Sequence, residues 1–171
     1  MKIISLLAIV LLVSLNSCAQ TNKNVDESST YYFIRNAEKD RSNPSDSNPH
    51  LNDKGQERAN NWSTYFNDVK FDAVYATDYN RTQETAKPTA NKNNVSVITY
   101  DPSKIANPEW FLTETKGKTI LIVGHSDTTP AFVNAIIGQK KYENIDDSVN
   151  GNLFIVTIKG DEITSEMKSI N

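Results

Sequence analysis

Three short clusters of polar and charged residues in this chain could do chemistry, because each directly follows a run of strand-forming residues. They are Arg35–Glu38, Asp78–Arg81 and Gly124–Asp127. Together they contain two arginines and a histidine, side chains well suited to binding tetrahedral anions such as phosphate. The second and third clusters also open predicted helices, whose N-termini favour anions. These residue types predict a phosphate site, provided that the fold brings the three clusters together.

The elements that must position these clusters alternate between strand and helix patterns. Strands are predicted over residues 30–35, 71–77, 95–100 and 118–125 from β-branched, aromatic and apolar runs. Helices are predicted over residues 51–66, 80–92 and 128–138. We expect Asn52 or Asp53 to cap the first helix, and Pro88 implies a late start or a kink in the second.

The order of these elements predicts the fold class. Alternating strands and helices indicate an α/β three-layer sandwich with a mostly parallel central sheet. The run at 118–125 is the most apolar and is expected at the centre of that sheet. Residues 152–170 predict two strands joined by a turn at Gly160 and Asp161, hence an antiparallel C-terminal hairpin at the sheet edge. In such sheets ligands bind beyond the carboxyl ends of the strands, where all three polar clusters fall.

Composition argues against several classes of function. The chain of 171 residues has a net charge of −3 and therefore no basic footprint, so nucleic acid is not an expected partner. Its two histidines and single cysteine exclude a disulfide framework and a Cys/His zinc site. Nothing in the pattern requires a metal ion or an organic cofactor.

The N-terminal segment has the layout of an export signal. An apolar run over Ile3–Leu15 is too short to span a bilayer comfortably. The letters LNSC that follow resemble a bacterial lipoprotein cleavage site with Cys18 as the lipid-bearing residue; the alternative is an ordinary signal cleaved nearby. We therefore expect a signal peptide over 1–17, the anchor cysteine and a flexible tether over 18–29, and one domain over 30–171. The expected location of the exported chain is the bacterial cell envelope, with attachment to a membrane surface through the lipid alone.

Around the polar clusters the chain resembles the histidine phosphatase superfamily, which has the phosphoglycerate-mutase-like fold, and most closely its small single-domain branch. FIRNAEK, from Phe33, is similar to the opening Arg-His-Gly/Ala-Glu motif of that family, and LNDKGQERA, from Leu51, to its next helix start. VYATDYNRTQETA and ILIVGHSDTTPAF are similar to the segments that carry its second phosphate-binding arginine and its second histidine. The resemblance extends from Tyr31 to Ile158 and implies that the partner is a phosphate-bearing small molecule or a phosphoprotein.

The resemblance also implies a role for each residue that matches a motif. Arg35 and Arg81 would bind the phosphoryl oxygens, and His125 would donate a hydrogen bond that stabilises the charge built up during transfer. An acidic residue would protonate the leaving group. The candidates for that residue are Asp101, Glu38 and Asp127.

The nucleophile of the family is the histidine that follows the first arginine, and Asn36 stands at that position. A neutral imidazole has an in-plane lone pair that can attack phosphorus. A carboxamide nitrogen has its lone pair delocalised into the carbonyl, and the amide oxygen is a poor nucleophile at neutral pH. Asn36 can therefore form hydrogen bonds with a phosphate but cannot carry the covalent intermediate.

Three hypotheses remain open from the sequence. The chain is a pseudo-phosphatase that retains a phosphate site, or a substrate-trapping form in which Asn36 was introduced into an active parent. Alternatively, it is an active phosphohydrolase that uses another nucleophile or direct attack by water. The retained Arg35, Arg81 and His125 fit a trap or a recent loss better than long decay. His50 lies in a loop rich in proline and asparagine, where we expect it to be solvated.

Overall fold

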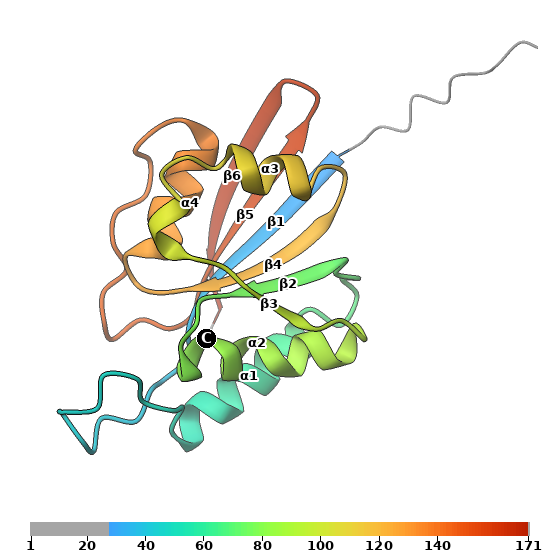
Figure 1. Cartoon of the computed structure of the whole chain (residues 1–171). Coiled ribbons are helices and arrows are strands. Elements are labelled where there is room, and N and C mark those ends of the chain that lie inside the picture. Colours follow the sequence, from blue (N-terminus) through green and yellow to red (C-terminus); the bar gives the residue numbers. More distant parts are fainter. Residues whose placement is uncertain (1–27, 171) are drawn as a thin grey trace, which may run out of the picture.

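The computed structural model describes residues 28–170, which form a central sheet with helices on both of its faces (Figure 1). The strands are β1 (Ser28–Arg35), β2 (Ala73–Ala76), β3 (Val97–Thr99), β4 (Thr119–Gly124), β5 (Asn152–Lys159) and β6 (Glu162–Ser169). The helices are α1 (Asp53–Tyr65), α2 (Asn80–Lys92), α3 (Glu109–Glu114) and α4 (Thr128–Ile137), with a 3₁₀ turn, η1 (Pro102–Lys104), before α3.

The six strands lie in the order β3-β2-β4-β1-β5-β6. Neighbours are parallel from β3 to β1, whereas β5 runs antiparallel to both β1 and β6. The predicted α/β sandwich, with β4 near its centre and a hairpin at its edge, is confirmed.

Side chains that alternate along the central strands divide the core into two halves. On one face of the sheet Phe33 of β1 packs against Phe132 of α4, with ring centroids 5.4 Å apart. On the opposite face Ile34 packs in the cluster that contains Trp62 of α1. This alternation places α3 and α4 on one face and α1 and α2 on the other (Figure 1).

The connections that leave β1 and β4 run to opposite faces of the sheet. These strands are parallel neighbours, and their register pairs Arg35 with Gly124. After β1 the chain leads to α1 on one face, and after β4 it leads to α4 on the other. Such a divergence opens a crevice at the carboxyl ends of the two strands. The backbone N–H of Asn36 donates to the carbonyl oxygen of Gly124 at 2.8 Å, a bond that links the chain segments just beyond β1 and β4.

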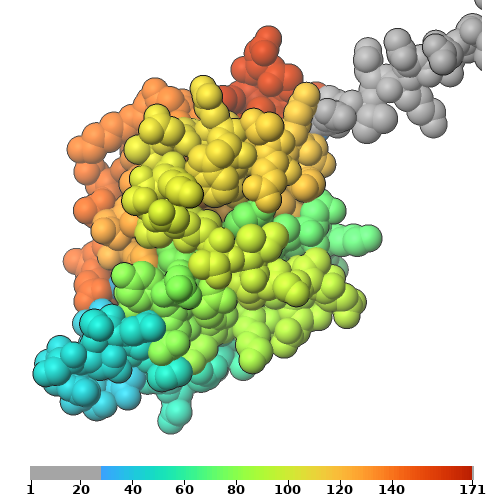
Figure 2. Space-filling model, viewed as in Figure 1, coloured from blue at the N-terminus to red at the C-terminus, as the bar shows by residue number. Residues whose placement is uncertain are grey.

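The loop between β1 and α1 projects from the body of the molecule, where it is coloured cyan in Figure 2. A bridge between Lys39 and Leu51 closes its base. Asn52 then caps α1, because its side-chain oxygen accepts from the backbone N–H of Gly55 at 2.9 Å. The first turn of α1 lies so close to this loop that a Cβ atom on Gly55 would be 2.2 Å from the carbonyl oxygen of Glu38.

Two boundaries differ from the sequence expectations. Strand β1 begins at Ser28, within the expected tether and two residues before the expected domain start, because Ser28 and Ser29 pair with Lys159 and Ile158 of β5. Helix α2 contains Pro88 but does not start late. Its first turn is fixed by the side chain of Asn48, which accepts from the backbone N–H of the first helical residue at 2.8 Å.

The predicted signal peptide, Cys18 and the tether up to residue 27 lie outside the described residues, so these assignments stay predictions. Within residues 28–170, no helix combines the length and the apolar character needed to cross a membrane.

Replacing Gly55 with alanine tests the close contact between α1 and the β1–α1 loop. Alanine is favoured over glycine inside a helix by about 1 kcal/mol, but here its methyl group would meet the backbone of Glu38. We expect the free energy of unfolding of Gly55→Ala, measured by urea denaturation, to fall by about 1–3 kcal/mol. Glu57→Ala, at an exposed position of the same helix, is the control and should be nearly neutral. Wild-type or higher stability of Gly55→Ala would contradict the close packing.

Candidate functional site

A cavity of about 460 Å³ opens at the carboxyl ends of β1 and β4. We call it the strand-end cavity. Its lining residues are Arg35, Asn36, Lys39, Tyr79, Arg81, Pro102, His125, Ser126, Asp127, Thr128 and Asp147. The fold thus brings residues from all three polar clusters of the sequence to one cavity, because each cluster follows a parallel strand that ends at the same edge of the sheet.

Arg35 ends β1 and is almost completely buried, with 4% of its surface exposed. Its Nη1 atom donates to the carbonyl oxygens of Asp146, at 2.9 Å, and Val149, at 2.8 Å. Its Nη2 atom donates to the carboxylate of Asp147 at 2.5 Å. Its Nε atom is buried and has no hydrogen-bond partner among the described residues. Burying a guanidinium is costly unless anionic or carbonyl groups accept its hydrogen bonds, and the loop before β5 supplies them.

Arg81 lies in the first turn of α2 and is half-buried. Its guanidinium carbon is 4.4 Å from the centroid of the Tyr79 ring, an arrangement that stabilises a cation on an aromatic face. Burial, and to a lesser extent the charge of Arg35, lower the pKa of Arg81. In the part of the chain that the structure describes, its guanidinium forms no hydrogen bond or ion pair, so its donors are available to a ligand in the cavity.

His125 follows β4 and is held as a neutral ring. Burial, followed by the positive charge of Arg81, lowers its pKa to about 4. Its Nε2 atom lies 2.9 Å from the hydroxyl oxygen of Thr77, and its ring meets the Tyr79 ring edge to face, with centroids 5.0 Å apart. At neutral pH, His125 therefore adds hydrogen-bonding capacity to the cavity without adding charge.

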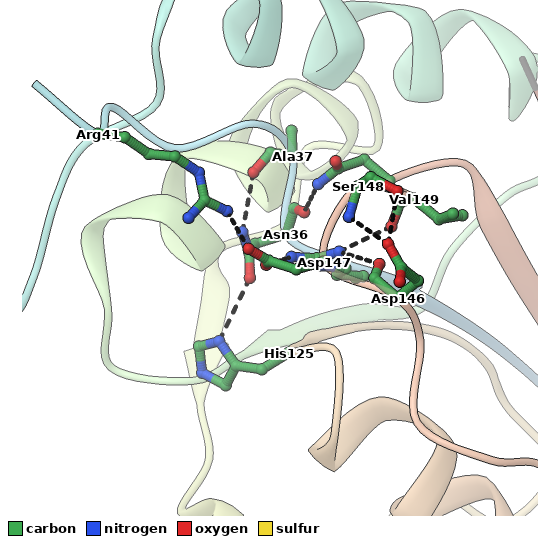
Figure 3. A network of polar contacts seen from close by, with 10 residues as sticks. Asn36, Ala37, Arg41, His125, Asp146, Asp147, Ser148 and Val149 are labelled. Carbon is green, nitrogen blue, oxygen red and sulfur yellow. Dashed lines mark hydrogen bonds and ion pairs between the residues drawn. The ribbon is translucent and has the colours of Figure 1, made fainter.

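The side chain of Asn36 lies between His125 and the backbone of Ala37 (Figure 3). Its Nδ2 atom donates to the carbonyl oxygen of Ala37 at 2.8 Å, which turns its Oδ1 atom toward Nδ1 of His125 at 3.3 Å. An amide oxygen only accepts, so the contact with Asn36 is a hydrogen bond when His125 carries a proton on Nδ1. Asn36 is 4% exposed, and its own carbonyl oxygen accepts from the side chain of Asn150 at 2.9 Å. Its carboxamide therefore orients His125 within the cavity.

The fold is shared with several solved structures at low sequence identity. YhfR from Bacillus stearothermophilus has a TM-score of 0.66 and 14% identity, over 84% of this chain and 98% of that chain. The protein histidine phosphatase SixA, complexed with tungstate, has a TM-score of 0.63 and 15% identity, over 82% and 96%. A phosphoserine phosphatase mutant from Entamoeba histolytica has a TM-score of 0.59 and 13% identity, over 80% and 94%. No curated protein sequence gives a significant match to this chain.

The sequence itself carries the family signature. Residues 31–102, from β1 through α2 to η1, match the model of the histidine phosphatase superfamily (branch 1). Over this region the chain is similar to the histidine phosphatase superfamily. The matched region includes Arg35, Asn36 and Arg81, and the remaining fold brings His125 to them.

Two of the three candidate proton donors suggested by the superfamily motifs lie away from the strand-end cavity. Glu38 is held by Arg58 through three contacts of 2.8–3.0 Å. Burial alone would raise the pKa of Glu38, but the hydrogen bonds and charge of Arg58 outweigh it and keep that pKa low. Asp101 is exposed and accepts from the backbone N–H of Ser103 at 2.9 Å, a bond that lowers its pKa. Neither carboxylate lines the cavity, because Glu38 binds Arg58 of α1 and Asp101 caps η1.

Asp127 is the remaining candidate, and it does line the cavity. It is exposed, and its carboxylate accepts from the backbone N–H of Thr128 at 2.8 Å at the start of α4. The acidic residues are dispersed: within residues 28–170 no group of three or more histidine, cysteine, aspartate or glutamate side chains could hold a metal ion.

Sequence reasoning assigned no role to two charged residues of the cavity, Lys39 and Asp147. Asp147, which binds Arg35, comes from an irregular loop 112 positions away in the sequence, and such a loop has no periodicity that would place it. Lys39 follows the first motif closely enough to have been suspected, because a loop residue just beyond a strand end commonly faces the same crevice. Burial and the charges of the neighbouring arginines lower its pKa.

The two histidines of the chain should titrate on opposite sides of their ordinary pKa. His125 should stay neutral down to a pH of about 4, whereas the hydrogen bond that the exposed His50 donates to Glu84 raises the pKa of His50. Nuclear magnetic resonance of the ring protons of the full chain, with His50→Gln for assignment, would separate the two. Between pH 6.5 and about 4, His125 is protonated in the unfolded state but neutral in the folded state. Protonation therefore favours unfolding in this range, so the free energy of unfolding is highest above pH 6.5 and falls as the pH is lowered toward 4. Titration of His125 near pH 6.5 would contradict the buried, cation-flanked ring.

Proposed function

We propose that this chain binds a phosphoryl group in the strand-end cavity but does not transfer it through a covalent intermediate, as a pseudo-phosphatase or a substrate-trapping form. One observation carries the proposal: Asn36, a carboxamide, shares the cavity with Arg35, Arg81 and His125. It stands where the family motif has its histidine nucleophile.

The charges around the cavity support anion binding. Three cationic side chains line it, Arg35, Lys39 and Arg81, against the carboxylates of Asp127 and Asp147. His125 is neutral because of its lowered pKa. The lining therefore has an excess of positive charge, which attracts an anion into a partly water-excluded site.

Hydrogen-bond donors for a phosphoryl group are also present. The guanidinium of Arg81 has no partner among the described residues, and the Nε atom of Arg35 is buried without one. The Nδ1–H of His125 is only weakly engaged, since its distance to Asn36 is 3.3 Å. These three donors come from different strand ends, and a tetrahedral anion could accept from all of them.

The proposed loss of catalysis follows from the chemistry of residue 36. In the family reaction, an imidazole nitrogen forms a bond to phosphorus while the ester oxygen leaves with a proton from an acid. The Asn36 amide nitrogen has no available lone pair, and it already donates to the carbonyl of Ala37. Loss of a nucleophile lowers kcat by roughly 10⁶ in a serine hydrolase. We expect a loss of similar order in this chain.

Two solved structures of the same fold support the binding of a tetrahedral oxyanion or a phosphate ester. The phosphoserine phosphatase mutant from Entamoeba histolytica, in which a histidine is replaced by alanine, is in complex with phosphoserine. SixA is complexed with tungstate, a tetrahedral oxyanion. By analogy, we propose that the ligand of this chain is a phosphate-bearing small molecule or a phosphoprotein, and that the missing imidazole does not prevent its binding.

An active hydrolase that uses water directly is the second candidate. The observation that favours it is the lowered pKa of His125, which keeps the ring neutral, with one unprotonated nitrogen, at neutral pH. Asp127 lines the same cavity and could protonate the leaving group. In this alternative, water forms the new P–O bond, the ester P–O bond breaks, and no phosphoenzyme is formed.

The N-terminal assignments complete the proposal. We propose that residues 1–17 direct export and that Cys18 carries lipid, so that the phosphate-binding domain faces the cell envelope. These residues lie outside the described part of the chain, and the proposal rests on the signal layout alone.

Arg81→Met tests the anion site. Loss of a charge-assisted hydrogen bond to phosphate costs about 1.5–3 kcal/mol, so the Kd for inorganic phosphate or tungstate, measured by calorimetry, should rise at least about tenfold. Lys87→Met removes one positive charge from an exposed position on the same helix, away from the cavity, and should leave the Kd nearly unchanged. Equal binding by wild type and Arg81→Met would remove Arg81 from the site.

Asn36→His tests the missing nucleophile. The wild-type chain should hydrolyse p-nitrophenyl phosphate negligibly, whereas Asn36→His should gain on the order of 10³-fold or more in kcat. Asn36→Gln keeps a carboxamide and should remain inactive. Brisk hydrolysis by the wild type, at a rate similar to that of Asn36→His, would favour direct attack by water or another nucleophile over the proposal.

A further inference from the structure

One edge of the Arg35 guanidinium is half occupied by the protein itself. Nε and Nη2 form one edge of a guanidinium, the edge that can bind two oxygens of a carboxylate or phosphate side by side. On Arg35 the Nη2 atom is taken by one oxygen of Asp147 at 2.5 Å, while Nε is buried without a partner among the described residues. Asp147 thus uses one donor of the pair and leaves the other unsatisfied.

Asp147 is also bound by a second arginine that lies in solvent. Its other carboxylate oxygen accepts from Nη2 of Arg41 at 2.5 Å. The side chains of Asp147 and Arg41 are 62% and 57% exposed, whereas that of Arg35 is 5% exposed. Figure 3 shows the contact between Asp147 and Arg41. The carboxylate can therefore leave Arg35 by rotating toward solvent while it keeps Arg41 as its partner.

Arg35 would stay in place if Asp147 moved. Its Nη1 atom is held by two backbone carbonyl oxygens, those of Asp146 and Val149, and neither depends on the Asp147 carboxylate. The guanidinium plane is thus fixed by the backbone, and its Nε–Nη2 edge is positioned before any ligand arrives.

We propose that the carboxylate of Asp147 is an internal competitor for the phosphoryl group, which must displace it from Arg35 to Arg41 before binding. This inference rests on the proposed function of the same cavity. A phosphoryl group offers two oxygens to the Nε–Nη2 edge and satisfies both donors, which the single oxygen of Asp147 does not. Its greater charge further favours it over a carboxylate, so displacement is downhill for a dianion.

The competition lowers the apparent affinity for every anion. When only a fraction of molecules has Asp147 away from Arg35, the apparent Kd is the intrinsic Kd divided by that fraction. Weakly binding monoanions, such as carboxylates, would be excluded first, while a phosphate monoester would still bind. Asp147 is then a specificity-determining residue and not a catalytic one.

The neighbouring aspartate provides a matched control. Asp146 carries the same charge in the same loop, but its carboxylate accepts from the backbone N–H and hydroxyl of Ser148, at 2.8 Å and 2.5 Å. Only its backbone oxygen contacts Arg35. Asp147→Asn and Asp146→Asn therefore make the same change in net charge, and only the first removes the competing carboxylate.

The test is calorimetric titration of the full chain with phenyl phosphate. We expect Asp147→Asn, and Asp147→Ala as a second variant, to bind about fivefold or more tightly than wild type, with Asp146→Asn within about twofold. Thermal unfolding would verify that each variant is folded.

Two results would overturn the competition while leaving the phosphate site intact. In the first, wild type binds phenyl phosphate and Asp147→Asn binds it no more tightly; in the second, Asp146→Asn gains as much affinity as Asp147→Asn. Absence of binding in wild type and all variants would overturn both proposals, whereas binding by the Asp147 variants alone would mean that the carboxylate closes the site completely.

Discussion

The parallel pairing of β1 with β4 is the constraint on which the rest of the site depends. Because Arg35 is in register with Gly124, Asn36 and His125 leave the sheet side by side, and the chain then diverges to opposite faces. Gly124 permits this arrangement, since a Cβ atom there would lie 2.7 Å from the Thr129 hydroxyl oxygen. A residue with a Cβ atom there would force the side chain of Thr129, in the first turn of α4, to shift.

A cation buried at the end of β1 imposes the second requirement. Arg35 is almost inaccessible to water, so the chain surrounds it with two carbonyl oxygens and one carboxylate from the loop before β5. Arg81 lies in the same cavity without such partners among the described residues. Its positive charge, after burial, contributes to the lowered pKa that keeps His125 neutral. Arginines that line one cavity repel each other, and an arrangement that tolerates this repulsion is suited to an anionic ligand.

The contacts of Asn36 explain how a carboxamide fits at the end of β1. Its amide group bonds both the backbone of Ala37 and the ring of His125, while its backbone is held by Gly124 and Asn150. A carboxamide thus satisfies the polar groups around it, and no buried donor is left unpaired at this position. Folding and anion binding require only that these contacts be satisfied. Covalent transfer, in contrast, requires a nucleophilic lone pair, which a carboxamide nitrogen does not offer.

The sequence by itself determined the layered α/β fold, the strand ends that carry Arg35, Asn36 and His125, and the absence of an imidazole at position 36, because these follow from local periodicity and residue chemistry. Local patterns could not show that Glu38 binds Arg58, or that Asp101 does not line the cavity. Nor could they show that Asp147 reaches Arg35 across more than a hundred residues. The tertiary structure decided these points, since the partner of a charged side chain depends on which distant loops the sheet order brings to the same edge.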